Sequence, residues 1–177
     1  MPKETDNLRT KLPLVLVLCL LAVLGNAFSI PLFFGVDLIF GSILTFIALR
    51  TLGLSVAIMV ALVGSSYTFF LWGHPWAIVI FTAEVIFVGF FSKKQSRNII
   101  ILDLLYWLLV GIPLVVLFYS QVIGMDGSQT GLICLKQAVN GTFNILVADL
   151  LVFAISLYSQ NYKNGRTTQS ITFSVFL

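Results

Sequence analysis

The sequence predicts an all-α, polytopic membrane protein: a bundle of six transmembrane helices with both termini on the cytoplasmic side. Of its 177 residues, 59% are hydrophobic and only 10% are charged, against roughly 25% charged residues in a soluble domain. Mean hydropathy is +1.04. So few polar residues cannot cover a soluble surface, which excludes an ordinary soluble enzyme, a disordered chain and a nucleic-acid-binding domain.

Six apolar segments approach the roughly 20 helical residues that cross a bilayer core about 30 Å thick. Lipid offers the backbone no hydrogen bonds, so each segment is expected to be a helix. A β-barrel would require alternating apolar and polar residues, which runs such as 12–24 lack. The second segment is short, and residues 26–35 before it are expected to be irregular or re-entrant. The six segments are Leu12–Phe28, Val36–Leu49, Leu52–Trp72, Pro75–Phe91, Asn98–Tyr119 and Leu135–Tyr158.

The basic residues predict the orientation. With the N-terminus inside, nine of the ten Lys and Arg residues lie on the cytoplasmic side, and Lys136 alone lies outside. The positive-inside rule therefore places both ends in the cytoplasm. A cleaved signal peptide, with Gly25 and Ala27 near the cleavage site, is an alternative that leaves the other five helices in the same orientation.

Three regions are expected along the chain. Residues 1–11 form a cytoplasmic tail, 12–159 a six-helix membrane domain, and 160–177 a cytoplasmic connector. The polar stretch 159–170 is followed by an apolar run, 171–177, that is too short to cross a bilayer. It looks like the start of a truncated further element. On the outer side, the glycine-rich residues 123–131 are expected to form a flexible turn.

Glu84 lies near the middle of the fourth segment. A charge at that depth costs at least about 2.5–3.5 kcal/mol, so the residue requires an explanation. One reading is a ligand-binding or proton-linked carboxylate. The other is a protonated acid that bonds to a neighbouring helix for packing.

The sixth segment carries Lys136, Asn140 and Asn144 at a spacing of four residues, which places them on one helix face. This face must point into the bundle, because lipid would penalise it. Lys136 could neutralise Glu84 or an anionic ligand, or extend to the headgroups. The asparagines could bind a ligand or join helices.

Trp72 and His74 lie at the outer end of the third segment, where Trp72 also fits an ordinary interfacial aromatic belt. One histidine and two separate cysteines indicate neither a metal site nor a cofactor. We expect a pocket that opens outward and binds an unknown small molecule. Its candidate ligand-binding residues are Trp72, His74, Glu84, Lys136, Asn140 and Asn144.

Three further acids have simpler explanations. Asp37 suits the first turn of the second helix, where the helix dipole favours a negative charge. Asp103 suits capping, or pairing with Arg97, at the start of the fifth helix. Asp149 is rotated about 220° from Lys136 at 100° per residue, so it should face another neighbour or a dimer contact.

Several blocks occur in the order found in a known group of sensors, and this resemblance covers about residues 25–160. The chain resembles the MASE-type N-terminal membrane sensory domains of bacterial sensor histidine kinases and diguanylate cyclases. It is more loosely similar to the substrate-binding subunits of energy-coupling-factor vitamin transporters. The blocks are Phe34–Asp37, Phe40–Ser42, Ala48–Arg50 with Gly53, Trp72–Pro75, Glu84, Leu105–Trp107 with Gly111–Pro113, and Lys136–Asn144.

The resemblance implies a signal-input module in the inner (plasma) membrane of a bacterial cell, homodimeric by analogy with two-component sensors. It also implies an output domain beyond this chain that receives the signal. No catalytic motif is present in the sequence, so the chain itself is not expected to be an enzyme. The alternatives are an uptake subunit that needs an ATPase partner and a membrane anchor that only dimerises. The expected partners are membrane lipid, an unknown small molecule and a second copy of the chain.

Overall fold

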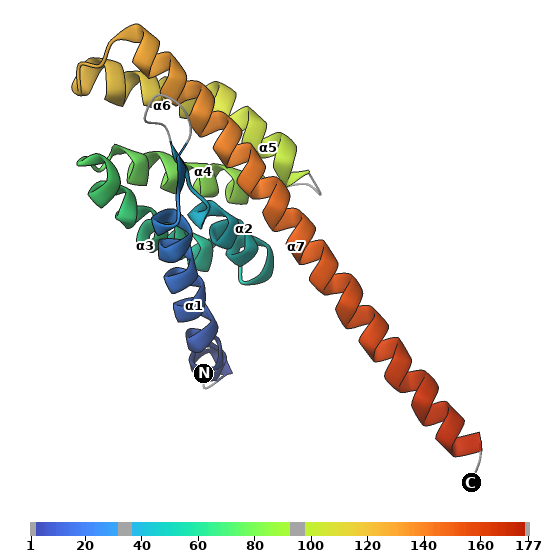
Figure 1. Cartoon of the computed structure of the whole chain (residues 1–177). Helices are drawn as coiled ribbons and strands as arrows, with labels where there is room; N and C mark the ends of the chain where they lie inside the picture. The colour runs from blue at the N-terminus through green and yellow to red at the C-terminus, as the bar shows by residue number, and fades with distance from the viewer. Residues whose placement is uncertain (1–2, 32–36, 93–97, 176–177) are drawn as a thin grey trace.

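A computed structural model describes the backbone of residues 3–31, 37–92 and 98–175, and the side chains of 11–31, 37–92 and 98–160. The fold is helical, with one pair of two-residue strands (Figure 1). Its elements are α1 (Lys3–Ala27), β1 (Ile30–Pro31), β2 (Asp37–Leu38), α2 (Gly41–Thr51), α3 (Leu54–Trp72), α4 (Trp76–Ser92), α5 (Ile99–Tyr106), η2 (Trp107–Gly111), α6 (Ile112–Val115), η3 (Val116–Val122) and α7 (Gly127–Val175).

The predicted all-helical membrane fold is confirmed. Three helices are long and apolar enough to cross a bilayer: α3, the continuous helix Ile99–Val122, and the Gly127–Gln160 part of α7. Shorter apolar helices form the other three segments: Lys11–Ala27, Gly41–Thr51 and Trp76–Ser92. Because α2 has only 11 residues, it covers about 16 Å at about 1.5 Å per residue, roughly half of the hydrocarbon core.

Two short strands precede α2 in the chain. Strands β1 and β2 pair antiparallel, with Ile30 opposite Leu38 and Pro31 opposite Asp37. This corrects the prediction that Asp37 lies in the first turn of a helix, because α2 begins only at Gly41. The expected irregular segment 26–35 is partly described, as the end of α1 and β1, and residues 32–36 lie outside the described residues.

Buried asparagines supply the hydrogen bonds that this backbone lacks. On one side, Asn26 Oδ1 accepts from Gly41 N at 2.8 Å, and Asn26 Nδ2 donates to Gly64 O at 2.9 Å. On the other side, Asn140 Oδ1 accepts from Ile39 N at 3.0 Å. Asn140 Nδ2 and Asn144 Nδ2 both donate to Ile39 O, at 3.0 and 2.9 Å. An unpaired buried amide or carbonyl is costly, so these side chains hold the junction between β2 and α2 in place.

Small residues allow the first three helices to pack closely. Ala22, Ala48 and Ala57 are fully buried in one core cluster, and a methyl group at Gly64 would lie 2.7 Å from Ala22 Cβ. Close backbone approach through small residues is how membrane helices gain packing energy without a hydrophobic effect between them. This packing holds α1, α2 and α3 together on one side of the bundle.

The helix Ile99–Val122 contains two π-helical stretches, η2 and η3, separated by the short α6. Pro113 lies in α6, inside this helix. A proline has no backbone N–H and clashes with the preceding turn, so the regular hydrogen-bond ladder cannot pass through it. Wider π-helical turns on both sides of Pro113 accommodate the interruption.

Helix α7 is the longest element, and it begins earlier than the sequence suggested. The predicted flexible turn 123–131 is wrong at its end, because Gly127 to Gly131 already form the start of α7. The cause is Asp126, whose Oδ1 accepts from Gln129 N at 2.9 Å and so caps the helix. With 49 residues, α7 is about 73 Å long at about 1.5 Å per residue, and it extends well beyond the bundle (Figure 1).

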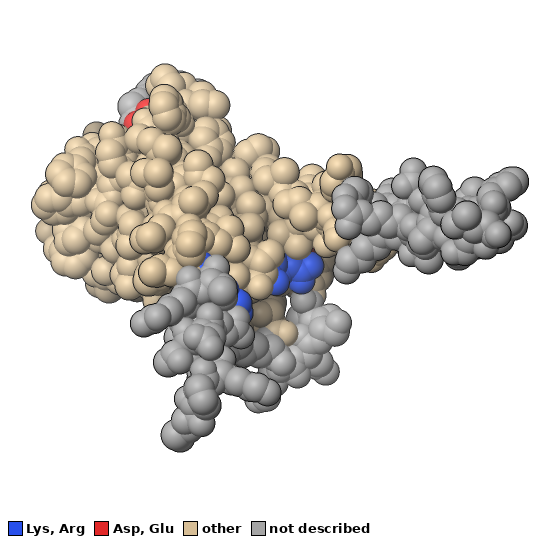
Figure 2. All heavy atoms as spheres, turned by 90° about the horizontal axis from the view of Figure 1, so that it is seen from below, with Lys and Arg blue, Asp and Glu red and all other residues tan. Residues whose placement is uncertain are grey.

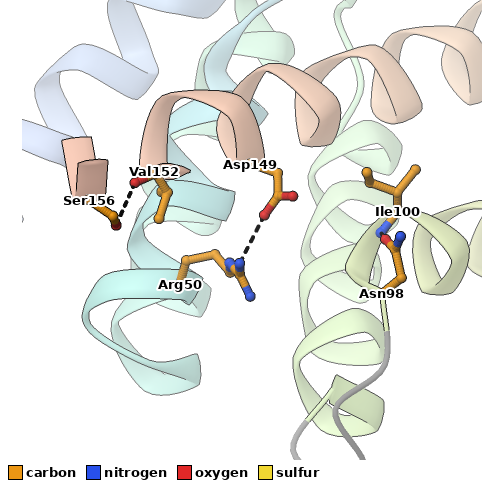
Figure 3. Close-up of polar contacts among 6 residues, drawn as sticks. All are labelled: Arg50, Asn98, Ile100, Asp149, Val152 and Ser156. Carbon is orange, nitrogen blue, oxygen red and sulfur yellow. Dashed lines mark hydrogen bonds and ion pairs between the residues drawn. The ribbon is translucent and has the colours of Figure 1, made fainter. Parts of the chain in front are cut away.

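One ion pair ties α7 to α2. Arg50 Nη2 lies 3.0 Å from Asp149 Oδ1 (Figure 3). The neighbour that Asp149 faces is therefore α2. Arg50 and Asp149 are partly exposed, as expected where a helix leaves the membrane. Figure 2, seen from the end where α1 starts and α7 leaves the bundle, shows Lys and Arg atoms on this face, in agreement with a cytoplasmic orientation.

Replacing Asn26 with Leu should destabilise the fold by at least about 1–3 kcal/mol, because the Gly64 carbonyl and the Gly41 N–H would be buried without partners. Unfolding in a graded detergent mixture, followed by circular dichroism, measures the change. Gln121→Leu is the control, because Gln121 is exposed and its side chain reaches only Ser120, at 3.4 Å. Equal stability of the two variants would contradict the role given to Asn26.

Candidate functional site

A cavity of about 190 Å³ lies at the outer end of the bundle. The connection between α3 and α4 forms one wall, and the first turns of α7 form another. Strand β2 and the end of the helix Ile99–Val122 complete the cavity. Its described lining residues are Asp37, Trp72, His74, Tyr119, Met125, Ile133, Lys136 and Gln137.

Lys136 contributes the positive charge of this cavity. Its Nζ lies 4.4 Å from the centre of the Trp72 ring, which is a cation–π contact. The alternative that Lys136 neutralises Glu84 is wrong, because among the described residues the one ion pair within 4.0 Å joins Arg50 and Asp149.

Asp37 contributes the negative charge. It lines the same cavity from β2 and acts electrostatically on Lys136. The two charged groups do not form an ion pair within 4.0 Å. The cavity therefore holds two opposite charges, neither of which has an ion-pair partner within 4.0 Å among the described side chains.

Three polar groups of the lining also lack hydrogen-bond partners in the described part of the chain. They are the Tyr119 hydroxyl, Gln137 Oε1 and His74 Nδ1. Tyr119 is 3% exposed and Gln137 is 1% exposed. Buried polar atoms are rarely left unpaired, and each such atom in a folded protein calls for an explanation. Here all three belong to residues that line one cavity.

His74 packs edge-on against Tyr119, with ring centres 4.9 Å apart. Its position in the α3–α4 connection is partly buried, and burial lowers the pKa of the imidazole below its ordinary value of 6.5. The ring is therefore mostly neutral at pH 7, and it gains a charge only in more acidic solution. In its neutral form it presents one donor and one acceptor nitrogen.

A second polar cluster lies deeper, between α4, α5 and α7. Glu84 is 1% exposed and Asp103 is 0% exposed. Trp107 Nε1 donates to Glu84 Oε1 at 2.7 Å, and Thr142 Oγ1 donates to Asp103 Oδ2 at 3.3 Å. The two carboxyl groups are close enough to interact with each other. A hydrogen bond between two carboxyls requires a proton on one of them, and that proton would also give Asp103 Oδ1 its missing partner.

The prediction that Asp103 caps a helix is therefore wrong, and its alternative, a pairing with Arg97, stays a prediction because it falls on an undescribed residue. Asn98 performs the capping, since its Oδ1 accepts from Ile100 N at 2.9 Å (Figure 3). Arg97 lies outside the described residues. Asp103 is on the inner face of the next turn, where only another helix can supply its partners.

Two glycines form a slot for the Trp107 indole. A methyl group at Gly111 would lie 2.5 Å from Trp107 Cε3. A methyl group at Gly141 would overlap Trp107 Nε1 and would lie 2.5 Å from Glu84 Oε1. The sequence places these residues on three separate segments, and the fold brings them together around the acid pair.

The six predicted ligand-binding residues divide into two groups. Trp72, His74 and Lys136 line the cavity. The other three are not in its described lining: Glu84 belongs to the acid pair with Asp103, and Asn140 and Asn144 hold the backbone of Ile39.

Sequence reasoning missed Gln137, Tyr119 and Trp107 as members of these sites. In the sequence, Gln137 is simply the residue after Lys136 and Tyr119 ends the fifth predicted segment, so neither position indicates a cavity. A signal for Trp107 was present, because it follows Asp103 by four residues and so shares its helix face. Asp37 could be recognised as a cavity residue only from the fold, since nothing in its local sequence indicates a strand.

Residues 1–125 match the protein-family model described as the 5TMR of 5TMR-LYT. This family is a membrane sensory domain of sensor kinases, as the sequence resemblance predicted, but the match does not support the MASE type specifically. The matched part contains the first five membrane segments, and α7 follows it. Neither the curated proteins nor the solved structures show a significant match to the chain.

Gly141→Ala should destabilise the fold by about 1–3 kcal/mol, because the added methyl group displaces the Trp107 indole and Glu84. Gly131→Ala, on the same helix, is the matched control. It meets no atom within 4 Å and should gain about 0.5–1 kcal/mol in helix propensity. Detergent unfolding monitored by tryptophan fluorescence measures both. Equal effects at the two glycines would contradict the tight slot.

Proposed function

The chain belongs to the 5TMR-LYT family, the five-transmembrane receptor of LytS-type histidine kinases, and on this premise we propose that its outer cavity receives a small solute and α7 reports the binding to the cytoplasm. The chain is then the signal-input module of a bacterial sensor protein in the inner membrane. The histidine kinase type of output follows from the family rather than from any residue in the chain.

The observation that carries this proposal is the continuity of α7. Lys136 and Gln137 line the cavity from the third turn of α7. The same helix then binds the junction of β2 and α2 through Asn140 and Asn144, and it contacts α2 again through Asp149. It continues without a break beyond the bundle (Figure 1). A displacement of α7 at the cavity would therefore be transmitted along one continuous helix to the cytoplasmic side.

A solute acts on such a helix only if it binds two arrangements of the bundle with different affinity. Couplings of this kind are typically worth about 1–3 kcal/mol, which changes a population ratio by roughly 5- to 150-fold. The cavity meets the requirement because its walls come from different elements, so a solute that bridges them favours one relative position. Asp37 reaches the cavity from β2, and Lys136 reaches it from α7.

The acid pair has a supporting role in this proposal. Glu84, Asp103 and Trp107 hold α4 and α5 against Gly141 and Thr142 of α7. Their contacts define how α7 sits in the membrane when the cavity is empty. We further propose that the module acts as a homodimer in membrane lipid and performs no catalysis itself.

Filling the cavity with a side chain should imitate an occupied state. We expect Ile133→Trp to change the distance between α2 and α7 by about 1–2 Å or more, the usual size of helix shifts in switching proteins. Pulsed electron paramagnetic resonance measures this distance between nitroxides on Cys introduced at Thr51 and Ser156. The chain is held in lipid nanodiscs, with Cys19 and Cys134 replaced by Ala.

Leu135→Trp is the matched control, because Leu135 lies on the same helix but is 64% exposed on the surface of the bundle, away from the cavity. It should leave the distance distribution unchanged. A folded Ile133→Trp variant with an unchanged distribution would overturn the proposed route from cavity to α7. An equal shift in both variants would also overturn it, because the effect would then not depend on the cavity.

A further inference from the structure

We propose that the outer cavity binds a small zwitterion: a molecule that carries a carboxylate and a protonated amine a few atoms apart, as an amino acid does. This inference rests on the proposed sensory function and specifies the chemistry of the solute. It is argued from the charges, the unpaired polar atoms and the size of the cavity.

The charges favour a ligand with both signs. Lys136 and Asp37 line the cavity without forming an ion pair within 4.0 Å. A simple carboxylate would pair with Lys136 and leave Asp37 unpaired beside a second negative charge. A simple amine would pair with Asp37 and leave Lys136 unpaired beside a second positive charge. A zwitterion that lies between the two residues pairs with both, and the occupied cavity then holds no uncompensated charge.

The unpaired atoms provide a second, independent reason. Gln137 Oε1 can only accept a hydrogen bond, so it requires a donor, which a protonated amine supplies. The Tyr119 hydroxyl can donate to a carboxylate. Lys136 and Tyr119 are thus suited to one end of the ligand, and Asp37 and Gln137 to the other. His74 Nδ1 is a further unpaired polar atom of the lining.

The size of the cavity limits the ligand. A volume of about 190 Å³ corresponds to roughly six water molecules at about 30 Å³ each. Sites for drug-sized ligands are larger, at about 300–1,000 Å³. The cavity therefore suits an amino acid with a small side chain better than an aromatic one or a peptide. Met125 and Ile133 offer an apolar wall for a methyl group.

Isothermal titration of the full chain in nanodiscs tests the proposal with three probes of similar size. They are alanine, propionate, which lacks the amine, and ethylamine, which lacks the carboxylate. We expect saturable binding of alanine, and at least tenfold weaker binding of the other two. Propionate or ethylamine binding as tightly as alanine would overturn the zwitterion. If alanine does not bind, glycine and β-alanine are titrated as two further small zwitterions. Absence of saturable binding for all three would overturn the proposal as well.

Two substitutions assign the ends of the ligand. Lys136→Met and Asp37→Asn should each weaken alanine binding at least tenfold, and Lys11→Met, on the exposed surface of α1, should not change it. If Asp37→Asn fails to fold, Gln137→Met removes an acceptor for the amine and should also weaken binding. Alanine binding that survives the loss of Lys136, or of an amine partner, would overturn the proposed site.

The binding test of the zwitterion and the distance test of the sensory function can fail independently. If no zwitterion binds but Ile133→Trp still shifts α7, then the ligand class is wrong and the route from cavity to helix stands. If alanine binds but neither alanine nor Ile133→Trp moves α7, then the binding site stands and the sensory function is wrong.

Discussion

The structure depends on one constraint: backbone groups in the hydrocarbon core must be hydrogen-bonded by the protein itself. The chain breaks its helical pattern before α2, and the side chains of Asn26, Asn140 and Asn144 provide the bonds that a helix would have made. These three residues come from the first and last helices of the bundle. The irregular backbone is thereby a meeting point for elements that are far apart in the sequence.

This arrangement also creates the cavity. With the β2–α2 junction held against α7, Asp37 is carried to the outer end of the bundle, where it lines the same space as Lys136. A continuous second helix would have placed other groups there. The polar lining of the cavity and the bonding of the interrupted backbone are therefore two results of the same local structure.

Much of the fold was predictable from the sequence, because composition, run length and the positions of Lys and Arg report directly on the solvent around each segment. The interruption before α2 was expected from Pro31 and Gly35, and the inward direction of the Lys136 stripe from the cost of facing lipid.

The site was predictable only in part. Spacing along α7 showed that Lys136, Asn140 and Asn144 share a helix face. It did not show that Asn140 and Asn144 bind backbone rather than ligand, because an amide side chain can do either equally well. The partnership of Glu84 with Asp103 depends on how α4 and α5 pack, which local patterns do not specify.

The two π-helical stretches place one residue of the cavity and one partner of the acid pair on the same helix. Trp107 lies in η2 and Tyr119 lies in η3, so one helix carries a member of each polar cluster on its wider turns. A π-helical turn converts to an α-helical one by passing its extra residue along the chain, and this conversion re-aims neighbouring side chains without melting the helix. A change of register at η3 would turn Tyr119 within the cavity, and a separate change at η2 would turn Trp107 relative to Glu84. The helix Ile99–Val122 thus joins the outer cavity to the buried acid pair through its two least regularly hydrogen-bonded stretches.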